Sequence, residues 1–277
     1  MKKFLIGFLF IFPLFADVFH PLNLVKKDGR TLVERIDTPL GFQRIPAEEG
    51  SFADYIRNHP LKEAASPVLL YNGNQKENQE AHCGIFKLSL DSQGLQKSAG
   101  SIFRLYAEYL YKFGYEDKIN FHLKNGSDCK WSEWKKNFRI DVSGNLKKWT
   151  KFENPPNKRQ TFDSYLKTVL ANTDITSMQI YDSESTDFEN LKIGDILMDM
   201  ANQKDVCLVV DMCENSKTGE KAVLLAHGGN PAQEFHILKN PKRINDPWYY
   251  EEDFFVSAKT PEYLFSKDSW RHMKYLE

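Results

Sequence analysis

The clearest pattern in the chain is an apolar stripe with helical spacing between residues 95 and 113. Leucine, isoleucine, phenylalanine and tyrosine side chains recur there three or four positions apart, as expected for a helix with one buried face. Asp91 or Ser92 can cap the start of this helix, and Gly114 ends the pattern. Two shorter helices are predicted at residues 51–58, capped by Ser51, and at residues 161–171.

Short apolar segments predict β-strands, and the densest group follows the long helix. In the last third of the chain, four such segments are joined by short polar links, one of them a hairpin turn at residues 216–219. A helix followed by an antiparallel meander is an α+β layout, in which a long helix packs on an antiparallel sheet. The predicted strands are residues 68–71, 81–90, 120–123, 138–142, 196–200, 207–212, 223–226 and 234–238.

The first sixteen residues have the three-part layout of a secretory signal peptide. A basic start at Lys2 and Lys3 is followed by an apolar run from Phe4 to Phe15 and by the small residue Ala16. The run is about a dozen residues long, whereas a spanning helix needs about 20. We therefore expect cleavage after residue 16 and a secreted or periplasmic product of residues 17–277; an uncleaved membrane anchor is the alternative. No later segment is long and apolar enough to cross a membrane.

Composition argues against some of the molecules that the chain could bind. The 277 residues carry a formal net charge of −1 with both signs interspersed, which argues against a nucleic-acid-binding surface. The chain has no tight cluster of cysteine and histidine, so no metal site is predicted, and no cofactor is expected. Four cysteines allow three disulfide pairings, and the sequence does not choose among them, although Cys83 with Cys207 is one guess. The four are Cys83, Cys129, Cys207 and Cys213.

One local pattern is similar to the core of papain-like cysteine hydrolases of the NlpC type. Residues 192–197 form a polar-x-Gly-Asp-apolar-apolar start of a strand, downstream of the long helix. In such enzymes a cysteine at a helix N-terminus faces a histidine at the start of a strand, and a polar group on the next strand orients that histidine. The helix end stabilises the thiolate, and the imidazole takes and returns its proton. The resemblance implies one papain-like domain with an N-terminal elaboration.

The chain also resembles a secreted bacterial family, domain of unknown function 4846, from about Ile36 to Phe265. Together the matching stretches are specific, although each alone is weak. They are residues 50–57, 67–73, 104–110, 194–195, 209–212, 230–238 and 247–249.

The chain departs from the family pattern at the chemically decisive positions. Where the family helix begins Leu-Gln-x-Cys-Ala, this chain has Ser98 in place of the cysteine. Asp205 stands where the family has a histidine, and His227 stands where it has a glutamine. The order of the predicted elements places all three at element ends that can meet in one cleft. Gln96, and His82, which matches a family histidine, are the predicted ligand-binding residues.

Three functional hypotheses follow. The first is an exported papain-like domain that has lost its Cys–His pair and binds a cell-envelope peptide or glycan, such as peptidoglycan, without cleaving it. The second is an active amidase or esterase with a rearranged Ser98–His227–Asp205 triad, since triads are recognised by geometry rather than chain order. The third is a structural or host-interaction protein, in which these side chains only bond nearby backbone. A further alternative concerns aromatic residues that could stack on sugars or belong to the core, namely Trp131, Trp134, Trp248, Tyr249 and Tyr250.

Overall fold

The computed structural model describes residues 23–142, 149–151, 158–200, 202 and 204–276. Within these residues the main feature is a nine-stranded sheet whose strand pairs are all antiparallel. Its order is β2–β11–β10–β9–β8–β15–β7, with β1 beside β9 and β12 beside β10. The bounds are β1 (Phe42–Arg44), β2 (His82–Ile85), β7 (Ser183–Ser185), β8 (Ile196–Met198), β9 (Val206–Asn215), β10 (Lys221–His227), β11 (His236–Leu238), β12 (Tyr249–Tyr250) and β15 (Trp270–Met273).

Three two-stranded hairpins lie outside this sheet. Two belong to the part of the chain between the long helix and the second long helix, and the third follows β12 near the C-terminal end. They are β3 (Asn120–His122) with β4 (Asp128–Lys130), β5 (Phe138–Ile140) with β6 (Trp149–Lys151), and β13 (Ser257–Lys259) with β14 (Leu264–Ser266).

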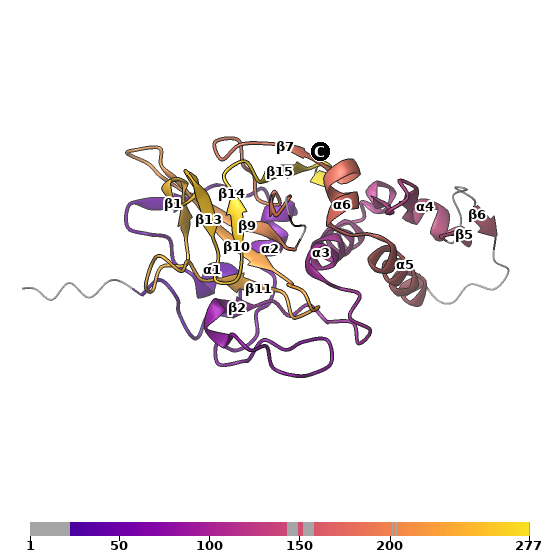
Figure 1. The fold of residues 1–277 in the computed structure, drawn as a ribbon, viewed down its shortest axis with the longest axis horizontal. Coiled ribbons are helices and arrows are strands. Elements are labelled where there is room, and N and C mark those ends of the chain that lie inside the picture. Colours follow the sequence, from indigo (N-terminus) through magenta and orange to yellow (C-terminus); the bar gives the residue numbers. More distant parts are fainter. Residues whose placement is uncertain (1–22, 143–148, 152–157, 201, 203, 277) are drawn as a thin grey trace, which may run out of the picture.

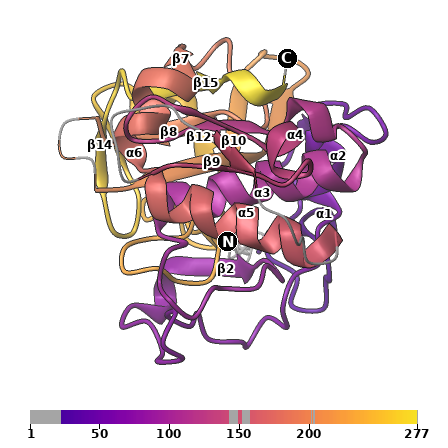
Figure 2. The same ribbon diagram turned by 90° about the vertical axis from the view of Figure 1, so that its right-hand side faces the viewer.

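Helix α3 lies between the sheet and α5, and α4 with the β5–β6 hairpin extends beyond α5 (Figure 1). Figure 2 shows the same helices from the side on which they cover the sheet. The helices are α1 (Leu32–Arg35), α2 (Phe52–Arg57), α3 (Ser98–Lys112), α4 (Trp131–Trp134), α5 (Lys158–Asn172) and α6 (Ile175–Ser177). Single helical turns occupy Gln79–Ala81, Glu116–Lys118, Met178–Asp182, Glu251–Phe254 and Lys274–Leu276.

The sheet has an apolar core on each face, because side chains alternate along a strand. On β9, Val206, Leu208 and Val210 join the core that contains the buried face of α3. Cys207 and Val209 point to the second core, which the β13–β14 hairpin covers with Ala258 and Phe265. Burying one such side chain fully contributes about 1.5–3 kcal/mol, so the two cores hold α3 and the hairpin on opposite faces.

Several sequence predictions are confirmed. The α and β content with an antiparallel sheet is as expected, and β8, β9, β10 and β11 are consecutive neighbours in a meander. Helix α2 begins after Ser51, whose hydroxyl accepts a hydrogen bond from the Asp54 amide. Helix α3 ends at Lys112, two residues before Gly114, which has the left-handed φ of 79° that glycine tolerates.

Other predictions are wrong in detail. Residues 68–71 form isolated bridges rather than a strand, and the strand expected over residues 81–90 ends at Ile85. The long helix begins at Ser98 rather than near Asp91, because the Asp91 carboxylate accepts the amides of Gln93, Leu95 and Gln96 and holds that segment as a loop. The sequence pattern also did not indicate β7, β12, β15 or the β13–β14 hairpin.

The predicted signal peptide, residues 1–16, lies outside the described residues. In the described part of the chain, no helix combines the length and the apolar character that crossing a membrane requires.

Candidate functional site

The N-terminal end of α3 is held against the ends of β9 and β10. The Ser98 amide donates a hydrogen bond to the Gly229 carbonyl (2.8 Å), and the Val206 amide donates to Ser98 Oγ (2.8 Å). Gly228 permits this approach, since a Cβ there would lie 2.1 Å from Ser101 Oγ and 2.8 Å from its Cβ. The helix start, the start of β9 and the end of β10 therefore meet, which is where the sequence placed positions 98, 205 and 227.

These three side chains form a chain of hydrogen bonds with Asp205 in the middle. The Ser98 hydroxyl donates to Asp205 Oδ1, and His227 Nδ1 lies 2.6 Å from Asp205 Oδ2. Asp205 and His227 are completely buried, and Ser98 is 2% exposed. Among the described residues, no hydrogen bond joins Ser98 to His227. The order in space is thus Ser–Asp–His, whereas a hydrolase triad needs the imidazole beside the hydroxyl.

The series of hydrogen-bonded side chains continues on the far side of His227. His227 and His236 are directly opposite each other on β10 and β11, and their Nε2 atoms are 3.1 Å apart. Lys76 Nζ lies 3.4 Å from His236 Nε2 and forms an ion pair with Glu262. Glu262, in the turn of the β13–β14 hairpin, places its Oε2 3.6 Å from His227 Nε2. The cluster therefore contains two carboxylates, one lysine and two imidazoles.

Burial sets the protonation of His236 and of Cys207, a thiol beside the cluster. Loss of solvent, followed by the neighbouring His227 and Lys76, lowers the pKa of His236 well below its ordinary value, so that ring is neutral. Burial, followed by the nearby Asp205 carboxylate, raises the pKa of Cys207 well above its ordinary value. Cys207 is therefore a thiol, which donates weakly to Asp205 Oδ2 at 3.9 Å.

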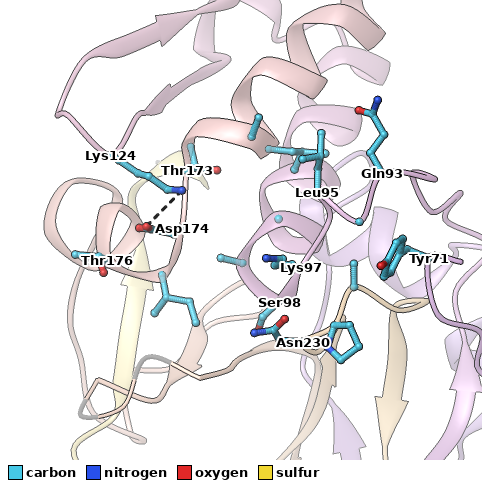
Figure 3. Close-up of a pocket in the computed structure, with 18 of the residues that line it drawn as sticks. Tyr71, Gln93, Leu95, Lys97, Ser98, Lys124, Thr173, Asp174, Thr176 and Asn230 are labelled. Carbon is cyan, nitrogen blue, oxygen red and sulfur yellow. Dashed lines mark ion pairs between the residues drawn. The ribbon is translucent and has the colours of Figure 1, made fainter. Parts of the chain in front are cut away.

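A cavity of about 590 Å³ opens on the other side of Ser98. Ser98 is one of the residues that line the cavity, whereas Asp205 and His227 lie behind the lining. In Figure 3, Lys124 and Asp174 stand on one side of the cavity and Tyr71 on the other, with Lys97 and Ser98 between them. Lys124 and Asp174 form an ion pair of 3.8 Å. Lys204 and Asn230 also contribute to the lining.

The arrangement holds Ser98 as a hydrogen-bond donor rather than as a nucleophile. A serine hydroxyl needs an adjacent base to become reactive, and a carboxylate is a much weaker base than an imidazole. The imidazole present, His227, contacts Asp205 and His236 instead of the hydroxyl. The geometry therefore does not provide the Ser–His pair on which the rearranged-triad hypothesis depends.

Asp205, Cys207 and His227 are also a possible metal-ligand set, with atoms within 4.8 Å of one another. Nitrogen and oxygen ligands on one tetrahedral zinc ion are about 3.3 Å apart, given metal–ligand distances of about 2.0–2.1 Å. The 2.6 Å between His227 Nδ1 and Asp205 Oδ2 is a hydrogen-bond distance. In this geometry the three side chains are hydrogen-bonded around the Asp205 carboxylate. The sequence prediction of no metal site stays a prediction.

The two predicted ligand-binding residues lie away from the described lining of this cavity. Gln96 is completely buried, and its Oε1 accepts a hydrogen bond from Arg104 Nη1 (2.8 Å). His82 borders a different cavity of about 460 Å³ beside Cys83. The centre of the His82 ring is 5.9 Å from that of the His236 ring, so His82 lies next to the buried cluster.

The remaining candidates from the sequence belong to the interior. All four cysteines are free thiols, so the guessed bridge between Cys83 and Cys207 is not formed. The aromatic residues considered for sugar stacking are at most 7% exposed and therefore belong to the core; these are Trp131, Trp134, Trp248, Tyr249 and Tyr250.

Sequence reasoning missed Lys76, His236 and Glu262. Lys76 lies in the link between the predicted strands at residues 68–71 and 81–90, and Glu262 lies in a hairpin that the hydrophobic pattern did not indicate. His236 could have been found, because it is the third residue of a predicted strand that follows the one ending near His227. Adjacent antiparallel strands joined by a short link place such ends opposite each other.

The fold and site together define a mixed α and β protein with a buried Ser–Asp–His–His chain under a polar cavity. Residues 32–272 match the family described as domain of unknown function (4846), and the chain belongs to that family. Searches of curated proteins and of solved structures find no match.

Proposed function

We propose that this chain is a papain-like domain of the NlpC type that works outside the cytoplasm and binds a cell-envelope ligand without cleaving it. The order of a helix followed by an antiparallel meander supports the papain-like interpretation. The meeting of positions 98, 205 and 227 at the ends of α3, β9 and β10 supports it further. The proposal of export rests on the sequence of residues 1–16 alone.

The observation that carries the non-hydrolytic part is the partner of Ser98. Its hydroxyl donates to the Asp205 carboxylate and accepts from the Val206 amide, so both its proton and a lone pair are engaged. Among the residues that the structure describes, no imidazole is hydrogen-bonded to this hydroxyl to remove its proton. The side chain that replaces the family cysteine thus closes the back of the cavity instead of attacking a ligand in it.

The cavity is suited to a peptide or glycan such as a soluble peptidoglycan fragment. Its volume of about 590 Å³ is in the range of small-molecule sites, which is about 300–1,000 Å³. Its lining combines an aromatic ring at Tyr71, amide groups at Gln93 and Asn230, and the ammonium groups of Lys97 and Lys204. These groups can stack on, or hydrogen-bond to, a polar ligand.

The test is a pair of measurements on soluble peptidoglycan fragments. Mass spectrometry after long incubation should show no cleavage, and calorimetry should show binding. Ala171→Trp, an exposed α5 position in the lining, should fill the cavity and abolish binding, whereas Ala65→Trp, at an exposed position outside it, should not. Cleavage that Ser98→Ala abolishes, or Ser98 labelling by a fluorophosphonate, would refute the proposal in favour of a hydrolase. Binding unaffected by Ala171→Trp would refute the cavity as the site.

A further inference from the structure

Both ring nitrogens of His227 face hydrogen-bond acceptors. Nδ1 lies 2.6 Å from an Asp205 carboxylate oxygen. Nε2 lies 3.1 Å from His236 Nε2 and 3.6 Å from a Glu262 carboxylate oxygen. A carboxylate oxygen can only accept a hydrogen bond. Whether His227 Nε2 carries a proton therefore depends on whether His236 Nε2 is a donor or an acceptor.

The tautomer of His236 follows from its other contact. His236 Nδ1 lies 2.7 Å from the Glu234 backbone carbonyl, which can only accept, so Nδ1 carries the proton. Because burial keeps the ring neutral, His236 Nε2 is a bare lone pair. That lone pair faces His227 Nε2 and also Lys76 Nζ at 3.4 Å. Without a proton between the two imidazoles, two lone pairs would face each other in a site that excludes water.

We propose that one proton lies between the facing Nε2 atoms of His227 and His236 and is bonded to His227. The resulting hydrogen bond, here called the clasp, is pH-sensitive and lies in the wall behind the cavity. The charges then balance, since protonated His227 and Lys76 stand against Asp205 and Glu262. Buried charges are tolerated when they are paired and hydrogen-bonded in this way.

The clasp fails in acid, because protonation of His236 Nε2 would place two N–H groups against each other. The other titratable or charged groups around the two rings are Cys207 on β9, His82 on β2, Lys76 before β2, and Glu262 and Tyr263 on the hairpin.

The clasp acts on the cavity through Asp205, which holds His227 with one oxygen and Ser98 with the other. The significance of this regulation therefore rests on the proposed function, whereas the proton itself can be observed without any ligand. The Val206 amide reports on the clasp, because it donates to Ser98 Oγ.

Nitrogen NMR of the uniformly ¹⁵N-labelled chain tests the proton directly. We expect His227 Nε2 to have the shift of a protonated nitrogen near neutral pH, and His236 to be the neutral Nδ1–H tautomer. Between about pH 4 and about pH 7, the Val206 amide should shift once as His236 takes up a proton. A bare His227 Nε2 near neutral pH overturns the proposal, as does a Val206 amide that does not respond to pH.

A variant tests the assignment of this shift to His236. In His236→Gln, a side-chain oxygen can accept from His227 Nε2 without titrating, so the acid-side shift of Val206 should vanish. His59→Gln is the matched control, because His59 also has a pKa lowered by burial but packs on Tyr55 and Phe86 instead of the cluster, so the shift should persist. An acid-side shift that persists in His236→Gln overturns the assignment. Failure to bind peptidoglycan fragments would refute the proposed function but leave these spectra unchanged, so the two failures are distinguishable.

Discussion

Ser98 and His227 are hydrogen-bonded to opposite oxygens of one carboxylate, that of Asp205, and among the described residues no hydrogen bond joins the two directly. This relationship joins the start of the long helix to the ends of two central strands through a completely buried acid. Each of the two side chains thereby satisfies one oxygen of the buried acid.

Asp205→Asn should destabilise the protein far more than Ser98→Ala. The first removes the negative charge that faces His227 at 2.6 Å, and breaking a buried ion pair costs about 3–5 kcal/mol. The second leaves the Val206 amide without its acceptor and costs about 1–3 kcal/mol. Urea denaturation should show this order, with exposed Asp268→Asn within about 0.5 kcal/mol of the parent. A loss below about 1 kcal/mol for Asp205→Asn would contradict the ion-pair assignment.

The double variant Ser98→Cys, Asp205→His should gain a reactive thiol. Positions 98 and 205 are in direct contact, so the new imidazole would lie beside a thiol at a helix N-terminus, which favours the thiolate. His227 would remain beside position 205 to orient the new ring. We expect faster alkylation by iodoacetamide than in Ser98→Cys alone, and measurable esterase or amidase activity. Equal alkylation rates in a folded double variant would argue against the papain-like interpretation.

Stability should fall as the pH drops below about 6.5, the ordinary pKa of histidine. Burial lowers the pKa of His236 in the folded chain, so below that pH the unfolded chain takes up a proton that the folded chain refuses. The half-buried His59 and His82 act in the same direction. Thermal unfolding across this range should be less pH-dependent in His236→Gln than in the parent. An unchanged slope would show that His236 is not a source of the acid sensitivity.

A single substitution of Asp211 should also destabilise the folded protein strongly. Its carboxylate is completely buried and accepts from Arg57 Nε and Arg44 Nε, both at 2.7 Å. Asp211→Ala leaves two guanidinium groups without their partner and should cost about 3–5 kcal/mol. The exposed Lys26–Asp37 pair is the control, since Asp37→Ala should cost about 1 kcal/mol or less. Similar costs for the two, measured by chemical denaturation, would contradict the prediction.

Expression with the native N-terminus in a bacterium should yield a periplasmic or secreted protein that begins after Ala16. The apolar run of residues 4–15 is the reason to expect export and cleavage. N-terminal sequencing and cell fractionation measure the result, and Leu5→Arg with Leu14→Arg should block export. A full-length product in the cytoplasm would remove the basis for a cell-envelope ligand.

The sequence predicted the local elements with strong periodicity and the meeting of three element ends. The α3 stripe, the Ser51 cap and the β8–β11 meander follow from spacing and capping, which depend on neighbours along the chain. Positions 98, 205 and 227 converge because a helix packed on a meander brings those ends together. The start of α3 was misplaced because the Asp91 side chain bonds the amides of a loop, which hydrophobic spacing does not encode.

The amino-acid sequence by itself thus determined which faces of α3 and the meander are apolar, and therefore that they pack. Only the tertiary structure decided that Asp205 lies between Ser98 and His227, and that Lys76, His236 and Glu262 complete the cluster. The physical reason is that a buried hydrogen-bond network depends on directions and distances of a few tenths of an ångström between segments far apart in sequence. Hydrophobic periodicity specifies which side is buried, but it does not specify which polar atom faces which.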